Sequence, residues 1–212
     1  MRVSDKSVQT SENAVRYTHV ETGSNKVCFM FSGSGYNYDK PLFYYATMLM
    51  LQHKIDCVHV HYSYEEDFLK KGYEGMADLM MEDVNPVIND VLKDRQYDEM
   101  IFLGKSLGTI PIAYDLMKRE DFVSSKMILL TPLLKFEGMV DTVLTSEHKG
   151  LLVIGDKDPS YKEEQLQQLR HSRLEIEVIH DANHSLSVGE FETIYSIKAL
   201  SNVMTKLEEV IK

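Results

Sequence analysis

A serine between two glycines stands where an apolar strand pattern gives way to a helix pattern. The segment GKSLG (104–108) follows the run DEMIFL at 98–103 and precedes helical spacing over 107–118. So sharp a turn strains the serine and requires residues without side chains two positions to either side, which Gly104 and Gly108 provide. The turn lifts the Ser106 hydroxyl above a sheet, where the N–H groups of a helix start favour developing negative charge. The pattern predicts a nucleophilic serine.

An acid and a base follow this serine in the order that such a turn requires. Asp158 lies in GDKDP after the run GLLVI, and His184 lies in DANH after LEIEVIH. His184 would take the proton from Ser106 and return it to a leaving group, while Asp158 would orient the imidazole. Asp156 is an alternative acid. Ser106 as a helix N-cap and His184 as an ordinary loop histidine are the competing interpretations.

Strand and helix patterns alternate along the whole chain, and several strand patterns are continuously apolar, as in strands buried on both faces of a parallel sheet. We expect an α/β fold: a doubly wound, mostly parallel sheet of about seven strands with helices on both faces, in one domain over residues 1–212. Residues 1–12 are expected to be disordered or to form an edge strand. The expected strands cover 15–21, 26–31, 56–62, 98–103, 126–130, 150–154 and 174–180.

The expected helices follow the strands, and serine–glutamate pairs mark two of their starts. Ser160 with Glu163 and Ser187 with Glu190 have the spacing of capping boxes, for a helix at 161–170 and for the last helix. The other expected helices cover 40–53, 76–92 and 107–118. Ligands of such folds bind at the carboxyl ends of the strands, where the loops hold the candidate serine, acid and base.

The motifs GKSLG, GDKDP and ANHS together resemble the α/β-hydrolase superfamily, especially its small lidless members such as dienelactone-hydrolase-like enzymes and carboxylesterases. The resemblance covers roughly residues 26–211. It implies Asp158 as the acid, because in these families the acid follows a glycine by three positions. It also implies an oxyanion loop. In the family this loop has the motif H-G-x-G, and in this chain the corresponding residues 32–35 are SGSG. The expected oxyanion donors are the N–H groups of Ser34 and Leu107.

Access to the site is expected to be open, because the interval 131–149 is too short for a cap with its own core. This segment and the loop at 62–73 would roof the cleft in part. Leu133, Leu134 and Phe136 would supply an apolar wall, and Tyr36 is one of several tyrosines in the carboxyl-end loops that can line a pocket.

Composition excludes several partners. The net charge is −10, so clustered basic residues for nucleic acid or an anionic membrane are not expected. No apolar run reaches the length of a membrane helix, no secretory signal is visible, and a cytoplasmic protein is expected. His180 and His184 have metal-like spacing but flank a strand end, so we expect no metal site, and no cofactor motif is complete.

Three functions follow from this site. The first is a hydrolase of a small-molecule ester, or of a thioester or amide, through an acyl-Ser106 intermediate. The second is an acyltransferase, in which an alcohol or amine replaces water at the same three residues. The third is a non-catalytic binding protein that keeps the fold.

Overall fold

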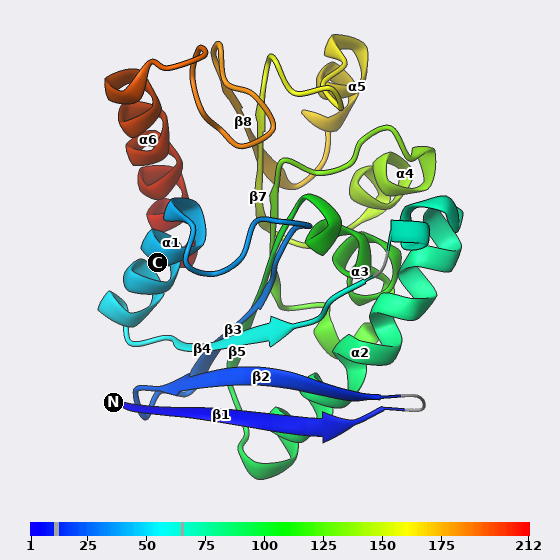
Figure 1. Cartoon of the computed structure of the whole chain (residues 1–212), viewed down its shortest axis with the longest axis vertical. Helices are drawn as coiled ribbons and strands as arrows, with labels where there is room; N and C mark the ends of the chain where they lie inside the picture. The colour runs from blue at the N-terminus through cyan, green and yellow to red at the C-terminus, as the bar shows by residue number, and fades with distance from the viewer. Residues whose placement is uncertain (11–12, 65) are drawn as a thin grey trace.

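One mixed sheet of eight strands lies between two layers of helices (Figure 1). The computed structural model describes residues 1–10, 13–64 and 66–212. The strands are β1 (Arg2–Gln9), β2 (Ala14–Glu21), β3 (Lys26–Phe31), β4 (Asp56–His61), β5 (Glu99–Lys105), β6 (Lys126–Leu130), β7 (Gly150–Gly155) and β8 (Leu174–Ile179). The α-helices are α1 (Pro41–Gln52), α2 (Gly72–Asp94), α3 (Thr109–Tyr114), α4 (Glu137–Thr145), α5 (Glu163–Leu169) and α6 (Thr193–Ile211). Short 3₁₀ turns are η1 (Glu66–Lys70), η2 (Ser106–Gly108), η3 (Leu116–Lys118) and η4 (Glu120–Phe122).

The strand order places a switch point beside the candidate serine. The order across the sheet is β1-β2-β4-β3-β5-β6-β7-β8, with β3 to β8 parallel to one another, β2 antiparallel to β4, and β1 antiparallel to β2. From β3 the chain crosses to β4 on one side, and β5 lies on the other. In open α/β sheets the loops that diverge at such a point leave a crevice for ligands. Here those loops begin at Ser32 and Ser106.

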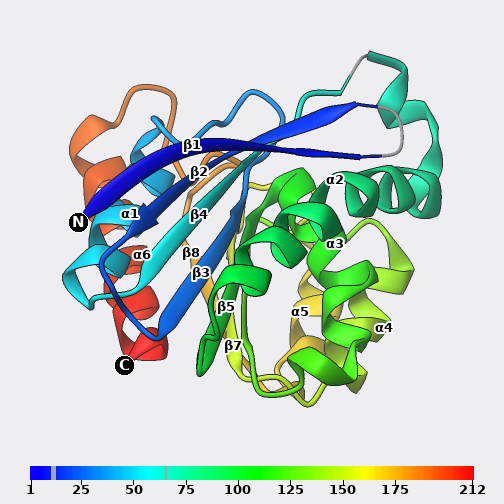
Figure 2. The same cartoon turned by 90° about the horizontal axis from the view of Figure 1, so that it is seen from below.

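Two apolar cores hold the helices to the sheet. One lies under α1 and α6 and includes Phe43, Met50 and Val203. The other lies under α2, α3, α4 and α5 and includes Phe29 and Phe102. Figure 2 shows the two layers on opposite sides of the twisted sheet. Side chains of a parallel strand alternate between the faces, so β3 and β5 supply both cores and read as continuous apolar runs.

The expected fold class is confirmed, with one strand more than the seven expected. The additional strand is β1, which pairs antiparallel with β2 from Arg2↔Glu21 to Gln9↔Ala14. Only two of its eight residues, Val3 and Val8, are large apolar residues, so its own pattern is weak, and its pairing with β2 defines it. Of the two outcomes expected for residues 1–12, the edge strand is found over Arg2–Gln9, and residues 11 and 12 lie outside the described residues.

The helices differ more from expectation than the strands. The single helix expected over 107–118 is two 3₁₀ turns around the six-residue α3. Neither expected capping box forms: α5 begins after Lys162 and α6 after Glu192, with no side-chain cap bond at either start. The interval 131–149 holds the one short helix expected of it, α4. No helix in the described part of the chain is both long and apolar enough to cross a membrane.

Candidate active site

The turn after β5 has the strained geometry that the glycine pattern predicts. Ser106 has φ +54°, in the left-handed region that residues with a side chain rarely occupy. A Cβ at position 104 would lie 2.2 Å from the Gly108 carbonyl oxygen, and one at position 108 would lie 2.0 Å from the Phe31 carbonyl oxygen. Neither distance is tolerable, so both positions require glycine. The predicted reason for the two glycines is confirmed.

Three side chains from three loops form one chain of hydrogen bonds. Ser106 Oγ lies 2.8 Å from His184 Nε2, and His184 Nδ1 lies 2.7 Å from Asp158 Oδ2. In the tautomer that fits these partners, the serine hydroxyl donates to Nε2 and the Nδ1–H donates to the carboxylate. The Asp158 carboxyl has no exposed surface, while 36% of the His184 side chain remains exposed. The ring therefore connects a buried acid to the Ser106 hydroxyl.

The two candidate acids contact two different histidines. Asp158 Oδ1 accepts the N–H of Ser160 at 2.8 Å, which leaves Oδ2 aimed at His184. Asp156 Oδ2 instead lies 2.7 Å from His180 Nδ1, and His180 is 83% exposed. The structure thus brings Asp158, rather than Asp156, to the serine and histidine.

Asp156, His180 and Asp181 are close enough to hold a cation. One ligand atom from each lies within 4.8 Å of the others, and this is the only such group within the described ranges. Lys157 Nζ already lies 3.6 Å from Asp181 and 4.0 Å from Asp156. A lysine in that position supplies the positive charge that the carboxylates need, so the group is explained as a solvated ion-pair network.

The loop after β3 approaches the serine closely. A Cβ at Gly33 would lie 3.1 Å from the Ser106 Cβ, and the Tyr36 N–H closes a tight turn on the Gly33 carbonyl at 3.2 Å. Ser34 and Leu107, the expected oxyanion donors, both line the adjacent cavity. A carbonyl oxygen that enters between them would meet backbone from both loops.

Two tyrosines hold this loop, and the sequence patterns did not separate them from other tyrosines. The Tyr38 hydroxyl accepts the Ser32 N–H at 3.2 Å and lies 2.7 Å from the Met30 carbonyl oxygen. The Tyr62 hydroxyl donates to the Ser32 carbonyl at 2.6 Å. Burial raises the pKa of both phenols well above the ordinary range, so both stay neutral. These two hydroxyls fix the main chain of Ser32, the position that is histidine in the family motif H-G-x-G.

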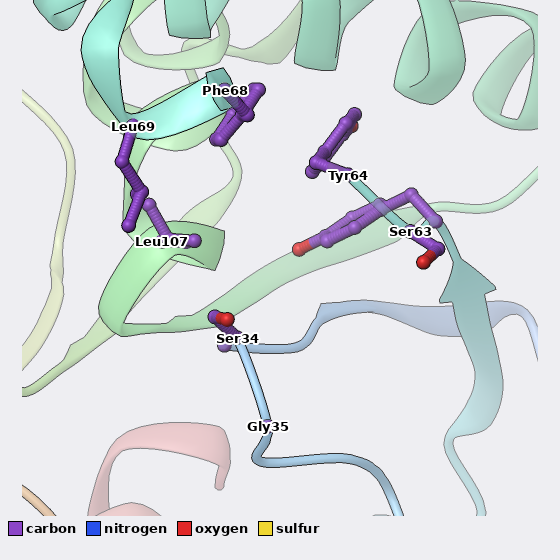
Figure 3. Close-up of a pocket in the computed structure, with 9 residues that line it drawn as sticks. Ser34, Gly35, Ser63, Tyr64, Phe68, Leu69 and Leu107 are labelled. Atoms are coloured by element: carbon purple, nitrogen blue, oxygen red, sulfur yellow. The ribbon is translucent and has the colours of Figure 1, made fainter. Parts of the chain in front are cut away.

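A cavity of about 410 Å³ opens beside Ser34 and Leu107. Figure 3 shows Phe68 and Leu69 of η1 across it from Ser34 and Gly35, with Leu107 near Leu69. No charged side chain lines it among the described residues, and three of its aromatic rings stack in sequence, Tyr62–Tyr64 at 5.2 Å and Tyr64–Phe68 at 4.1 Å. The lining residues are Gly33, Ser34, Gly35, Tyr62, Ser63, Tyr64, Phe68, Leu69 and Leu107.

None of the three residues expected from sequence to bind substrate lines this cavity. Leu133 and Phe136 do not line this cavity but pack against the core, with Phe136 stacked on Tyr73 at 5.0 Å. Tyr36 lines a smaller cavity of about 240 Å³ beside Leu186 and Ile197. Of the two expected roof segments, the loop at 62–73 reaches the larger cavity. Its aromatic spacing, Tyr62, Tyr64 and Phe68, was the signal available in the sequence.

Comparison with known proteins identifies the class that this fold and site belong to. A family model for the alpha/beta hydrolase domain matches residues 25–212, so the chain belongs to the α/β-hydrolase family. No curated protein matches the sequence significantly.

Solved structures with the same fold include esterases, a dienelactone hydrolase and a serine hydrolase without lid. An esterase of Pyrococcus furiosus is 14% identical at a TM-score of 0.71, over 100% of this chain and 92% of its own. A serine hydrolase without lid from Xanthomonas campestris is 11% identical at a TM-score of 0.70, over 100% of this chain and 94% of its own. A dienelactone hydrolase of Anabaena variabilis is 16% identical at a TM-score of 0.68, over 99% of this chain and 96% of its own. At these identities the likeness concerns the fold alone.

Proposed function

We propose that this protein is a serine hydrolase that cleaves a small uncharged carboxylic ester through an acyl-Ser106 intermediate. The observation that carries the proposal is the hydrogen-bonded chain from Ser106 Oγ through His184 to the buried Asp158, at the switch point of the sheet. Membership of the α/β-hydrolase family and the esterases among its structural neighbours support the same reaction class.

Acylation begins when Ser106 Oγ attacks the ester carbonyl carbon and its proton moves to His184 Nε2. The carbonyl oxygen becomes an oxyanion, for which the N–H groups of Ser34 and Leu107 are the proposed donors. The carbon–oxygen bond to the alcohol then breaks, and the alcohol leaves with the proton from His184. Asp158 stabilises the imidazolium and keeps Nδ1 protonated throughout.

Deacylation repeats these steps with water in place of the alcohol. Water attacks the acyl carbon while His184 Nε2 takes one of its protons. The bond to Ser106 Oγ breaks, the proton returns to the serine, and the carboxylic acid leaves. An alcohol or amine acceptor would turn the same sequence into acyl transfer, so product analysis must separate the two reactions.

The cavity beside the donors suggests which acyl groups fit. Its lining is uncharged and partly aromatic, and a volume of about 410 Å³ is enough for a small molecule. No lysine or arginine lines it among the residues the structure describes, so a carboxylate on the acyl chain would be desolvated without a partner. We therefore expect neutral acyl groups to be preferred over dicarboxylic half-esters.

A fluorophosphonate probe tests the nucleophile directly. We expect the folded protein to form one adduct, mapped by peptide mass spectrometry to Ser106, and the Ser106→Ala variant to form none. Turnover of p-nitrophenyl esters from acetyl to octanoyl should fall by about 10⁴- to 10⁶-fold in that variant. Its thermal midpoint should hardly change, because alanine meets the same left-handed strain as serine. An adduct on another serine, or none on the folded protein, would remove the proposal and leave a binding role.

A further inference from the structure

A lysine lies inside the turn that carries the serine, and its side chain is buried. Lys105 is the last residue of β5, and only 1% of it is exposed. The elbow pattern G-x-S-x-G allows any residue at this position, so sequence alone assigns Lys105 no role. An ammonium removed from water is unfavourable unless its donors find partners. The contacts of Lys105 Nζ therefore need an explanation.

The ammonium reaches three loops at the carboxyl edge of the sheet. Nζ donates to the Thr131 hydroxyl at 3.1 Å and to the His184 backbone carbonyl at 3.0 Å. It also lies 4.6 Å from the centre of the Tyr36 ring, within range of a cation–π contact. Two of the three N–H donors of the ammonium thus have hydrogen-bond acceptors, and the ring face stabilises the charge. The partners follow β6, β8 and β3 in turn.

The bond to the His184 carbonyl differs from the other bonds of that loop. Asn183 Oδ1 accepts the N–H groups of Ser185 and Ser187, which sets the internal shape of the loop. The Lys157 N–H donates to the Ala182 carbonyl at 3.0 Å, which ties the loop to the segment after β7. The bond from Lys105 ties the residue that carries the imidazole to the residue that precedes Ser106.

We infer that Lys105 is a positioning residue, whose ammonium holds the main chain of His184 and so keeps the imidazole in line with Ser106 Oγ. The inference rests on the proposed function, since it assigns Lys105 to the same proton-transfer step. A charged donor suits this task because charge-assisted hydrogen bonds are shorter and stronger than neutral ones. Misalignment of a general base by a fraction of an ångström slows proton transfer without removing any reacting group.

The protonation state of Lys105 gives this inference a specific signature. Burial lowers the pKa of Lys105 to about 8, against the opposing attraction of Asp158. The titratable groups around it are Asp158, His184 and the Tyr36 phenol. All three remain in a Lys105→Met variant, so the ratio of wild-type to variant rates isolates the lysine. That ratio should be constant below about pH 8 and should shrink above it, because the neutral amine is a weaker donor.

The test compares rates of fluorophosphonate labelling and of ester turnover across this pH range. We expect Lys105→Met to lower the labelling rate and kcat about tenfold to a hundredfold near neutral pH, with KM little changed. Lys157→Met is the matched control: it removes the same charge, from a side chain whose ion pairs are with Asp156 and Asp181 rather than with Ser106, His184 or Asp158. It should label at the wild-type rate.

A second pair of variants keeps the test decisive if Lys105→Met does not fold. Thr131→Val removes one acceptor of the ammonium, and Thr131→Ser keeps it, so only the valine variant should label more slowly. Equal labelling of wild type and Lys105→Met would overturn the inference and leave the proposed function standing. If Lys105→Met labels more slowly but the ratio of wild-type to variant rates does not depend on pH, the inference is also wrong, and Lys105 contributes through packing alone. Failure of the wild type to label would remove the proposed function itself.

Discussion

Two carboxylate–histidine pairs lie at the same edge of the sheet, and in both the nitrogen–oxygen distance is 2.7 Å. In the pair of Asp158 with His184, the carboxyl is fully buried and Ser106 lies on the far side of the ring. In the pair of Asp156 with His180, 83% of the histidine side chain is exposed and 20% of the aspartate side chain. The distance does not separate the pairs. What distinguishes them is the burial of the carboxylate and the presence of Ser106 as a third residue bonded to the histidine.

The difference shows why one pair suits proton transfer. An exposed ion pair is screened by water and salt, and its contribution to stability or reactivity is small. A buried carboxylate held by the Ser160 N–H keeps a fixed direction toward the imidazole, and low dielectric strengthens its effect on a developing imidazolium. Each pair also has its own lysine, buried Lys105 beside one and exposed Lys157 beside the other.

The largest effect expected from this comparison concerns the buried acid. Asp158→Asn should lower kcat by about 10⁴-fold, because the amide no longer fixes the imidazole tautomer or stabilises its charge. Steady-state turnover of a short-chain ester measures this. Circular dichroism should show the fold unchanged, since asparagine still accepts the Ser160 N–H. A loss below tenfold would mean that the buried pair does not orient a catalytic base.

The next effect concerns stability, and it contrasts the two lysines. Lys105 has a pKa of about 8 when folded, against 10.5 for an ordinary lysine, and burial is the main cause. Between these values the unfolded chain binds the extra proton, so the free energy of unfolding rises with pH and is lost as pH falls toward 8. Relative to Lys105→Met, wild type should gain up to about 3 kcal/mol between pH 8 and 10.5.

Urea unfolding of the two proteins across this window measures that gain. The quantity to compare is the difference in the free energy of unfolding between wild type and Lys105→Met, because the wild-type value alone also contains the titration of other groups. Burial raises the pKa of Tyr62, Tyr64 and Tyr73, and these phenols lower stability as pH rises above their unfolded pKa. The variant keeps all of them, so their contribution cancels. Lys157→Met should show no such divergence from wild type. Parallel curves for Lys105→Met and wild type would contradict the altered pKa of Lys105.

The comparison also marks how far sequence can go. The strands are predictable to within one or two residues, because β3 to β8 form short apolar runs bounded by polar loops. Ser106, His184 and Asp158 are predictable as a set because chain order and two obligatory glycines constrain them. The choice between Asp156 and Asp158 rests on resemblance alone, since both follow the same strand and each has a histidine within reach.

Other features depend on tertiary contacts that no local pattern contains. Burial of Lys105 depends on loops after β3, β6 and β8, which meet only in the folded sheet. The capping boxes failed because other bonds compete for the same groups: Ser160 N–H donates to Asp158, and Ser187 N–H donates to Asn183. Leu133 and Phe136, which the sequence predicts as an apolar wall, are partly buried against the core and do not line the larger cavity. Loop packing, unlike strand pattern, is set by distant residues.

The smallest effect expected belongs to the exposed pair. Asp156→Asn and His180→Ala should each change kcat and KM by less than about threefold, because neither residue contacts Ser106 or His184 and their mutual attraction is screened by solvent. The stability of His180→Ala should change little, since surface substitutions away from structural features stay within about 0.5 kcal/mol. The same ester assay and urea series used for Asp158→Asn measure both variants. A loss in Asp156→Asn equal to that in Asp158→Asn would mean that the two carboxylates act on one base, and the contrast between buried and exposed pairs would no longer hold.

Addition of EDTA should leave the wild-type rate unchanged, because Lys157 supplies the cation at Asp156 and Asp181. A rate that falls with EDTA and returns with a divalent ion would place a metal in that group and give the exposed pair a role of its own.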